Sequence, residues 1–352
     1  MATLYLTEQQ SIVKKRDGYL VVQYQDKRKV EVPLIKVSQV IVCGDITLTT
    51  PALHMLLEMG IEVCFLSMYG QFRGRLSPPI AKNAFVRREQ YSTCVDAQRG
   101  LLAAQAFVKG KLGNMRTMLL RANRQLQDDE VSVAADAIQS SILQIPFAPK
   151  VGSLLGVEGQ GSAAYFSVFG KLLRSSMTFN RRRRRPPTDP VNAMLSLGYT
   201  LLQHQVSSAI QVVGLDPYLG FLHQPRHGRP ALALDLMEEF RPLITDSVVL
   251  NICNHRLLTA QDFHEELGVV HLKPDARKKF YAKFEERLQE EIQHPQFGYR
   301  TSYQRCIELQ TRLLSKVEDP CPHERPPARA ASSCRRACSA SGSRVRSMLT
   351  LP

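Results

Sequence analysis

The stretch GVEGQGSAAYF, residues 156–166, places a single carboxylate, Glu158, among three glycines and ahead of small and aromatic residues. It lies in a segment, 153–173, whose apolar residues recur at helical spacing. Glycine lets a neighbouring backbone come close, and the stretch holds no lysine or arginine to neutralise the acid. A first-turn acid favoured by the helix dipole is the ordinary explanation. The stretch predicts a closely packed helix and leaves open whether Glu158 has partners from distant segments.

Helical patterns dominate the chain on both sides of this stretch. A proline-rich break at 77–83 precedes them, and beyond it the sequence favours helix nearly to residue 317. The predicted helices cover residues 85–126, 129–143, 153–173, 188–213, 240–253, 257–267 and 274–293. Residues 85–317 are therefore predicted to form one large helical domain.

The residues before the break favour strands instead. Leu20, Val22 and Tyr24 alternate with polar residues after an Asp-Gly turn, and several similar short runs follow. One helix is predicted around TTPALHMLLEMG, with Thr50 as N-cap and Gly60 at its end. The sequence thus predicts an α+β fold, in which a small N-terminal β-sheet domain, residues 1–80, precedes a larger all-helical domain.

Composition narrows the functional class. The chain has 352 residues, 44% of them apolar, which is enough for two domains with buried cores. Its net charge of +14 remains strongly positive when the arginine-rich residues 321–352 are left out. Positive charge spread over the chain indicates a polyanionic partner, of which nucleic acid is the first candidate. The alternative is that the charge serves only solubility.

Targeting signals are not evident in the sequence. No run of about 20 apolar residues is present, and the first residues lack the apolar core of a signal peptide. The cysteines up to Cys306 stand singly and form no Cys-x2-Cys pair, as is common in a reducing compartment. We therefore expect a cytoplasmic protein with no membrane partner.

Two further segments carry groups that could join Glu158. His223 ends an apolar run and opens a loop rich in glycine, proline and arginine. In ALALDLMEEFRP, Asp235 and Glu238 are three residues apart, so a helix would place both carboxylates on one face, where a cation would offset their repulsion. If each feature is considered alone, His223 is explained as a hydrogen-bonded structural residue. The two acids are then explained as solvated side chains at the start of a helix.

A run of five arginines precedes the helix predicted over 188–213. Planar guanidinium groups can form paired hydrogen bonds with the oxygens of a phosphate, which favours a phosphate-binding role. The alternative is that the arginines are only solvated or serve as a targeting signal. Asn192 lies in an otherwise apolar first turn and is expected to hold a neighbouring backbone or side chain. The candidate phosphate contacts in this run are Arg181, Arg182, Arg183, Arg184 and Arg185.

Four motifs together resemble one family. GVEGQGSAAYF, RRRRPPTDPVNAMLSLGYTLL, GLDPYLGFLH and LALDLMEEFRPLI occur in the order and spacing of the CRISPR-associated adaptation integrases, the Cas-one family. The N-terminal GDITLTTPALHMLLEMGIEVCFLSMYGQFRGRL and the later LKPDARKKF are similar to the same family. The resemblance extends over about residues 1–316.

The resemblance implies an N-terminal β-sheet domain used for dimerisation and a helical catalytic domain, in a homodimer from a prokaryotic cytoplasm. Two such dimers would be bridged by a small Cas-two partner. The family's metal ligands fall on Glu158, His223 and Glu238, and Asp235 matches an acid that supports the site. Two carboxylates and one imidazole suit Mn²⁺ or Mg²⁺.

The activity implied is insertion of short prespacer DNA into a CRISPR array, by attack of a 3′-hydroxyl on a phosphodiester of the repeat. Many members also cleave DNA. Further contacts with the backbone of double-stranded DNA would come from Lys273, Arg277, Lys278 and Lys279. Two alternatives remain: a metal-dependent, structure-specific nuclease of DNA repair, and a non-enzymatic DNA-binding scaffold.

The last residues depart from the family pattern. Residues 318–352 are rich in alanine, serine, arginine, proline and cysteine and show no apolar period. Such composition predicts a disordered basic tail. The composition of this segment resembles translation in another reading frame or a degraded 3′ end of the gene. All the proposed metal ligands lie before it in the sequence.

Overall fold

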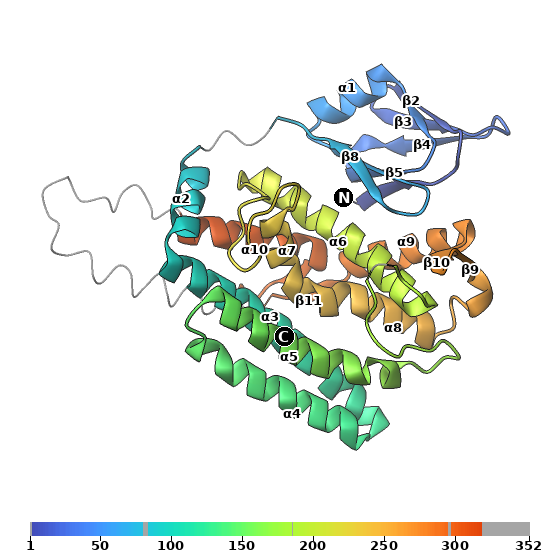
Figure 1. Cartoon of the computed structure of the whole chain (residues 1–352). Helices are drawn as coiled ribbons and strands as arrows, with labels where there is room; N and C mark the ends of the chain where they lie inside the picture. The colour runs from blue at the N-terminus through green and yellow to red at the C-terminus, as the bar shows by residue number, and fades with distance from the viewer. Residues whose placement is uncertain (1, 80–83, 185, 295–296, 319–352) are drawn as a thin grey trace, which may run out of the picture.

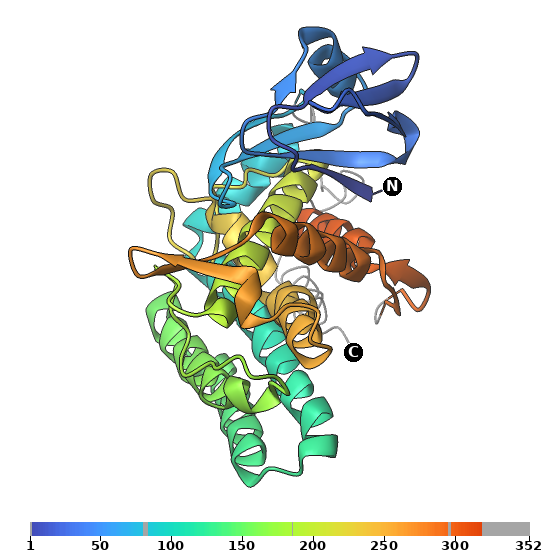
Figure 2. The same cartoon turned by 90° about the vertical axis from the view of Figure 1, so that its right-hand side faces the viewer.

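The computed structural model describes residues 2–79, 84–184, 186–294 and 297–318. Arg185, and the predicted tail beyond Glu318, lie outside the described residues. Figures 1 and 2 show a small β-rich N-terminal region that sits against one side of a larger helical region. This architecture confirms the predicted α+β fold class.

The N-terminal region contains two four-stranded sheets. The first has, in sheet order, β1 (Ala2–Leu6), β5 (Val37–Cys43), β7 (Glu62–Leu66) and β8 (Phe72–Leu76). The second has β4 (Lys29–Pro33), β3 (Tyr19–Gln23), β2 (Ile12–Arg16) and β6 (Thr47–Leu48). In the first sheet β8 alone runs antiparallel to its neighbour. Alternating residues such as Leu20 and Val22 fill the small core of this region.

The predicted N-terminal helix is confirmed as α1 (Thr50–Glu58). Its N-cap residue is Thr49, one position before the predicted Thr50, and proline stands in the first turn. Gly60 follows the helix with φ +73°, a left-handed conformation that favours glycine. A short 3-10 turn at Leu34–Lys36 precedes β5.

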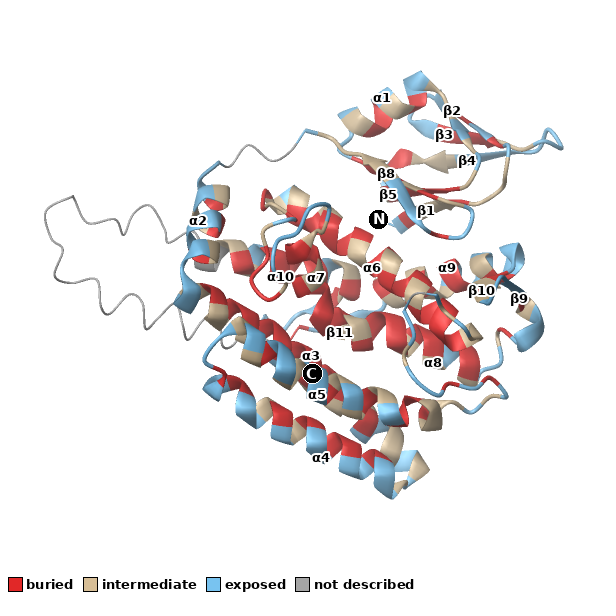
Figure 3. Ribbon diagram, in the orientation of Figure 1, coloured by how far each residue is buried: buried red, intermediate tan, exposed pale blue. Residues whose placement is uncertain are grey.

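The helical region packs around one large apolar core. Its helices are α2 (Ala84–Val95), α3 (Ala97–Leu126), α4 (Asp129–Gln144), α5 (Val151–Val168), α6 (Pro190–Val213), α7 (Ala231–Phe240), α8 (Ser247–Asn254), α9 (Pro274–Gln289) and α10 (Tyr303–Glu318). Short 3-10 turns cover Ile145–Phe147, Phe169–Leu172 and Ala260–Asp262. Figure 3 shows that α4 exposes one face, whereas α7 is buried along most of its length. None of the described helices combines the length and the apolar character needed to cross a membrane.

The helix predicted over 257–267 was wrong, because this segment holds the 3-10 turn Ala260–Asp262 and the first strand of a β-hairpin. β9 (Phe263–Glu266) pairs antiparallel with β10 (Val269–Leu272). Leu267 and Gly268, between the strands, both have positive φ, at 52° and 76°. Two such residues make the tight hairpin turn whose twist matches that of the strands. A second small hairpin joins β11 (Glu291–Gln293) to β12 (Arg300–Ser302), so strands interrupt the predicted all-helical region.

A local cap also divides the helix predicted over 85–126. The carboxylate of Asp96 accepts the backbone N–H of Gln98 at 2.9 Å and that of Arg99 at 3.0 Å. This N-cap begins α3 and separates it from α2.

The two regions share a polar and aromatic contact. Gln205 of α6 donates from Nε2 to Thr3 at 3.0 Å and to Gln39 at 2.8 Å. The rings of Tyr5 and Tyr281 stack with centroids 4.9 Å apart. The β-rich region therefore packs directly on α6 and α9, which fixes its position relative to the helices.

His204, at this contact, gives a pH-dependent prediction. Burial, with help from nearby Arg75, lowers the pKa of His204 to about 4. An unfolded chain binds a proton on this residue near pH 6.5, so the free energy of unfolding should fall as the pH drops from 6.5 to 4. The loss should be about 3 kcal/mol and complete below pH 4, because one pKa unit equals 1.36 kcal/mol. Urea unfolding of the wild type and of His204→Gln across this range would measure it.

His204→Gln should lack this part of the acid sensitivity. Other titrating groups are common to both proteins, so the difference between the two pH profiles isolates His204. Parallel profiles would show that the folded protein accepts a proton on His204 as readily as the unfolded chain does.

Candidate active site

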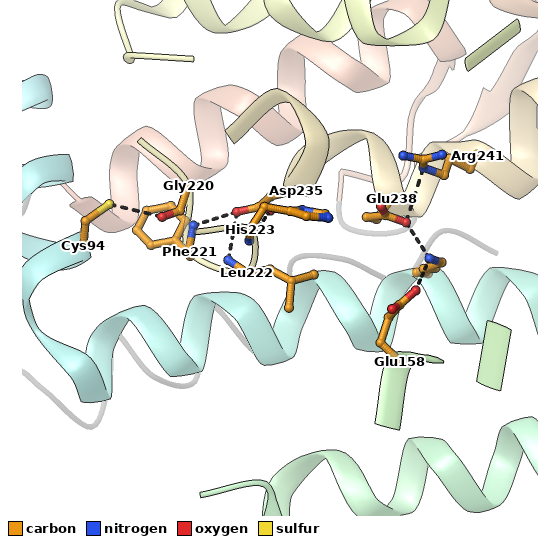
Figure 4. Close-up of polar contacts among 10 residues, drawn as sticks. Cys94, Glu158, Gly220, Phe221, Leu222, His223, Asp235, Glu238 and Arg241 are labelled. Carbon is orange, nitrogen blue, oxygen red and sulfur yellow. Dashed lines mark hydrogen bonds and ion pairs between the residues drawn. The ribbon is translucent and has the colours of Figure 1, made fainter. Parts of the chain in front are cut away.

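Glu158 and Glu238, which lie far apart in the sequence, converge on one cation. Glu158 projects from α5 and Glu238 from α7, and Figure 4 shows them facing each other. The ammonium of Lys111, on α3, forms an ion pair with the Glu158 carboxylate and lies 2.7 Å from Oε2 of Glu238. The Lys111 side chain is only 5% exposed. Repulsion between the two carboxylates is therefore offset by a buried positive charge.

The position of Glu158 depends on close packing of α5 against α3. A Cβ added to Gly161 would come within 2.6 Å of Leu112 Cδ2, so a larger residue there would have to displace the buried Leu112 side chain. Gly156 and Gly159 have open space, and the predicted close approach thus rests on Gly161 alone. Ser162, one turn after Glu158, donates a hydrogen bond of 2.8 Å to the same carboxylate oxygen that faces Lys111.

Asp235 organises the loop that carries His223. Its fully buried carboxylate accepts the backbone N–H of Phe221 at 2.6 Å, of Leu222 at 2.9 Å and of His223 at 2.9 Å. Oδ1 also lies 2.7 Å from Nδ1 of His223. A Cβ at Gly220 would meet Oδ2 of Asp235 at 2.8 Å, so the loop needs glycine at that position.

The hydrogen bond between Nδ1 of His223 and Oδ1 of Asp235 bears on the tautomer of His223. An ionised carboxylate can only accept, so Nδ1 carries a proton, and in the neutral imidazole the lone pair then lies on Nε2. In Figure 4 His223 lies on the side of Asp235 that faces Glu238. The imidazole is close enough to Glu238 to influence the pKa of that carboxyl. His223 can therefore offer a neutral nitrogen ligand near the two acids.

Glu238 is held ionised although its side chain is buried. Burial alone would raise its pKa, but Arg241 and Lys111 outweigh burial, and the pKa falls to about 2. Nε of Arg241 lies 3.3 Å from Oε2 of Glu238. A carboxylate that stays charged in a dry setting is suited to bind a cation.

A buried network behind Glu238 fixes Arg241. This arginine begins the π-helical turn Arg241–Asp246, a form often found at functional sites. Its guanidinium lies 4.5 Å from the centre of the Tyr199 ring. The hydroxyls of Tyr199 and Tyr165 donate to Asp246 at 2.6 and 3.0 Å. Burial raises the pKa of Asp246 to about 6, against the opposing effect of these hydrogen bonds and nearby arginines.

The described part of the predicted arginine run has one partly buried member, Arg182, and exposed neighbours. Arg182 turns inward: its Nη1 donates to Asn192 at 2.7 Å, and its guanidinium lies 5.3 Å from the centre of the Tyr199 ring. Asn192 also holds the backbone of Arg181 and Arg183, each at 2.9 Å, as expected for an internal asparagine. Arg181, Arg183 and Arg184 are exposed, whereas Arg182 supports the site from within.

The predicted basic residues near α9 are mostly exposed as well. Lys273 donates to the backbone oxygen of Gln261 at 2.6 Å. Lys278 pairs with Glu8 and, at 3.5 Å, with Asp275. Lys279 is exposed, and Arg277 is half-buried.

Sequence reasoning missed Lys111. Its partner Glu158 is 47 residues away, so no local pattern connects them. One signal was present, because Lys111 lies on the helical stripe of Ala104, Phe107 and Val108 that becomes the buried face of α3. A lysine on such a stripe needs a buried partner.

The donor set fits a divalent ion in its chemistry. Over the residues that the structure describes, no three His, Cys, Asp or Glu side chains already converge as ligands of one ion. Lys111 instead supplies the positive charge between the two carboxylates. A metal held by Glu158, Glu238 and Nε2 of His223 would take over the role of this ammonium, and such oxygen and imidazole ligands suit Mn²⁺ or Mg²⁺.

Two curated relatives show how far the similarity extends. A Cas4/Cas1 exonuclease–endonuclease fusion of Geobacter sulfurreducens is 41% identical over 322 residues, which cover 89% of this chain and 57% of the fusion. The chain thus spans little more than half of that relative. The CRISPR-associated endonuclease Cas1 3 of Thermus thermophilus is 37% identical over 318 residues, covering 90% of this chain and 93% of that protein.

Solved structures and a family model agree with these relatives. The CAS1 protein TM1797 of Thermotoga maritima superposes with a TM-score of 0.79 at 25% identity, covering 90% of this chain and 97% of that one. A chain of a Cas6-RT-Cas1–Cas2 complex has a TM-score of 0.74 at 28% identity, covering 90% of this chain and 34% of its own. The family model described as CRISPR associated protein Cas1 matches residues 4–286. The chain therefore belongs to the Cas1 family.

Proposed function

We propose that the chain is a metal-dependent DNA endonuclease and strand transferase that inserts prespacer DNA into a CRISPR array. The observation that carries the proposal is the convergence of Glu158 and Glu238, from α5 and α7, on one buried cation. The endonuclease names of the relatives, one of which the chain matches over 93% of its length, support nuclease chemistry.

The reaction is a transesterification. The 3′-hydroxyl oxygen of the prespacer loses its proton and forms a bond to a phosphorus of the repeat, while the bond to the displaced 3′-oxygen breaks and that oxygen takes up a proton to leave as a hydroxyl. Mn²⁺ or Mg²⁺ would lower the pKa of the attacking hydroxyl and offset charge on the phosphate. Glu158, Glu238 and His223 would hold the ion. Arg241 adds positive charge beside Glu238, whereas the ion would take the place of the Lys111 ammonium between the two carboxylates.

Asp235 acts as a positioning residue in this proposal. Asp235→Asn should weaken Mn²⁺ binding by about 10- to 100-fold, because the amide does not fix the Nδ1–H tautomer of His223 as a carboxylate does. Isothermal titration with Mn²⁺ would measure the affinity, and excess Mn²⁺ should restore part of the activity. The exposed Asp136→Asn on α4 is the control. An unchanged affinity in Asp235→Asn with intact folding would show that Asp235 supports the loop alone.

DNA would be held by the exposed basic residues Arg181, Arg183, Arg184, Lys273, Lys278 and Lys279, with Arg277 beside them. Such contacts set affinity more than sequence choice, and binding should weaken with salt. The solved neighbour that contains Cas1 and Cas2 supports a small Cas2 partner for this chain. Dimerisation through the β-rich N-terminal region is part of the proposal.

Strand transfer tests the proposal. The purified protein and a Cas2 partner would be mixed with a labelled prespacer, a supercoiled plasmid carrying the repeat, and Mn²⁺. Label that joins the plasmid supports integration. Nicking without joining would favour a structure-specific repair nuclease, and binding without any reaction would favour a DNA-binding scaffold.

A further inference from the structure

A further buried carboxylate, Asp246, lies behind the candidate active site. It ends the π-helical turn that Arg241 begins, and its side chain is fully buried. Oδ1 accepts a hydrogen bond from the hydroxyl of Tyr199 at 2.6 Å, and Oδ2 accepts one from Tyr165 at 3.0 Å. Both donors are neutral, and Asp246 forms no ion pair with any residue that the structure describes. The carboxylate is thus hydrogen-bonded without a direct counter-charge.

The groups around Asp246 come from several elements. Its titratable or charged neighbours are Tyr165 from α5, Tyr199 from α6, Arg241 from the start of the π-helical turn and Arg182 from the segment before α6. On the α9 side, Arg287 donates from Nε to the backbone oxygen of Leu243 in the same turn, at 2.8 Å. From α3, the uncharged Met118 lies 2.9 Å from the hydroxyl of Tyr165. Asp246 therefore faces guanidinium groups at longer range than its two hydrogen bonds.

The charge of Asp246 lowers the stability of the fold. Burial raises its pKa to about 6, although the hydrogen bonds from Tyr199 and Tyr165 oppose the shift. Asp246 is therefore ionised near neutral pH, in a setting that favours its neutral form. An asparagine would remove that charge while it kept an oxygen to accept a hydrogen bond. A buried charge that a neutral residue of the same shape could replace is more typical of a functional site than of a structural core.

Arg241 connects this carboxylate to Glu238. Its Nε lies 3.3 Å from Oε2 of Glu238, but this buried N–H makes no hydrogen bond among the described residues, so the contact is one of charge. Its guanidinium lies 4.5 Å from the centre of the Tyr199 ring, whose hydroxyl donates to Asp246. Burial alone would lower the pKa of Arg241, yet Glu238 and Asp246 both act to raise it. Two acids thus keep the guanidinium charged.

A metal ion at Glu238 would change the balance of charge around Arg241. Figure 4 shows Arg241 and Glu158 on opposite sides of Glu238. A divalent ion held by the two glutamates would replace the Lys111 ammonium, so the guanidinium would lie near two positive charges instead of one. Like charges at short range in a poorly solvated site repel each other strongly. Asp246 is a nearby acid that the ion would not bind, so its charge can offset that of Arg241.

We propose that Asp246 is a positioning residue of the metal centre, whose negative charge keeps Arg241 beside Glu238 when a divalent ion binds. Asp246 touches neither the ion nor DNA and acts through Arg241 and the Tyr199 ring. The identity of the metal ligands rests on the proposed function. Because the action is indirect, the effect of removing the charge of Asp246 should depend on the presence of Arg241.

Isothermal titration with Mn²⁺ near neutral pH tests this role. Asp246→Asn should bind Mn²⁺ at least about tenfold more weakly than the wild type, an effect typical of residues that support a metal ligand. Arg241→Met in the Asp246→Asn background should restore most of the affinity, because the charge that needed an offset is gone. Asp136→Asn, which neutralises an exposed acid on α4, is the matched control and should bind like the wild type. Equal weakening in Asp246→Asn with and without Arg241→Met would overturn the proposal.

The pH dependence separates this role from a structural one. As the pH falls through about 6, Asp246 takes up a proton in the wild type and loses its charge. The ratio of the Mn²⁺ affinities of the wild type and Asp246→Asn should therefore approach one at low pH, although protonation of metal ligands weakens binding in both proteins. A ratio that stays constant would show that Asp246 serves the fold alone.

Metal-free protein gives an independent measure of the same titration. In EDTA, the urea midpoint of Asp246→Asn relative to the wild type should rise as the pH increases from 3.8 to about 6. The wild type loses stability over this range because Asp246 ionises at lower pH in the unfolded chain than in the folded protein. A constant difference between the two midpoints would contradict the titration of Asp246 on which the proposal depends.

A second variant covers a failure of Asp246→Asn to fold. Tyr165→Phe removes one of the two donors that favour the charged form of Asp246, so the fall in Mn²⁺ affinity should move to higher pH than in the wild type. An unmoved profile would count against the proposal. Glu158→Gln separates this inference from the proposed function, since wild-type Mn²⁺ binding by that variant would mean that the metal centre itself is wrong. If Glu158→Gln loses Mn²⁺ while Asp246→Asn keeps it, this inference alone fails.

Discussion

Glu158→Ala is expected to lower both strand transfer and DNA cleavage by about 10³-fold or more. The variant removes one of the two carboxylates that converge on the buried cation. Losing a metal ligand forfeits several kcal/mol of charge stabilisation in the transition state, and each 1.36 kcal/mol corresponds to a factor of ten in rate. Initial rates of label transfer to plasmid, at saturating Mn²⁺ and equal protein concentration, would measure the effect.

The fold should survive this substitution. Lys111 keeps its pairing with Glu238 at 2.7 Å, so no buried charge is left alone. Thermal unfolding by circular dichroism would verify that the variant is folded. Asp136→Ala, which removes an exposed acid from α4, is the matched control and should retain wild-type rates. Retention of more than a tenth of the activity by Glu158→Ala would remove Glu158 from the catalytic centre.

Much of the fold follows from local sequence patterns. The helix around residues 50–58 was predictable because a threonine cap, a proline in the first turn and a terminal glycine agree. The same kind of pattern gave a wrong prediction for residues 257–267. The local structure there is set by a two-residue turn at Leu267 and Gly268, both with positive φ. Helical spacing of apolar residues in a short segment does not exclude a hairpin.

The candidate site was predictable only in part. Glu158, His223 and Glu238 were proposed as ligands through the family resemblance of ordered motifs, and the structure brings Glu158 and Glu238 onto one ammonium. A run of arginines favours solvated side chains, but Arg182 is drawn inward by Asn192 and the Tyr199 ring. Such burial depends on tertiary contacts that no local pattern encodes. The same holds for Lys111, whose partners come from two other helices.

Lys111→Met is expected to have opposite effects on stability and on metal affinity. In metal-free protein the variant leaves Glu158 and Glu238 facing each other without the shared ammonium, with Arg241 at 3.3 Å as partner of Glu238. Breaking a buried pair from one side typically lowers the free energy of unfolding by about 3–5 kcal/mol. Mn²⁺ binding should become about tenfold tighter, or about 1.4 kcal/mol, because the ion no longer competes with an ammonium.

Urea unfolding in EDTA and in Mn²⁺, together with paramagnetic resonance of free Mn²⁺, would measure both effects. Because a ligand that binds the folded state alone stabilises it, Mn²⁺ should restore more stability to Lys111→Met than it adds to the wild type. The control is the double variant that carries both Lys111→Met and Glu158→Gln. Because both charges are removed, it should lose less stability without metal than Lys111→Met does, and Mn²⁺ should no longer bind it more tightly than the wild type. Equal or weaker Mn²⁺ binding by Lys111→Met would mean that the ammonium and the ion do not share one place. Lys111 would then serve the fold, and the ion would have to be sought away from the line between Glu158 and Glu238.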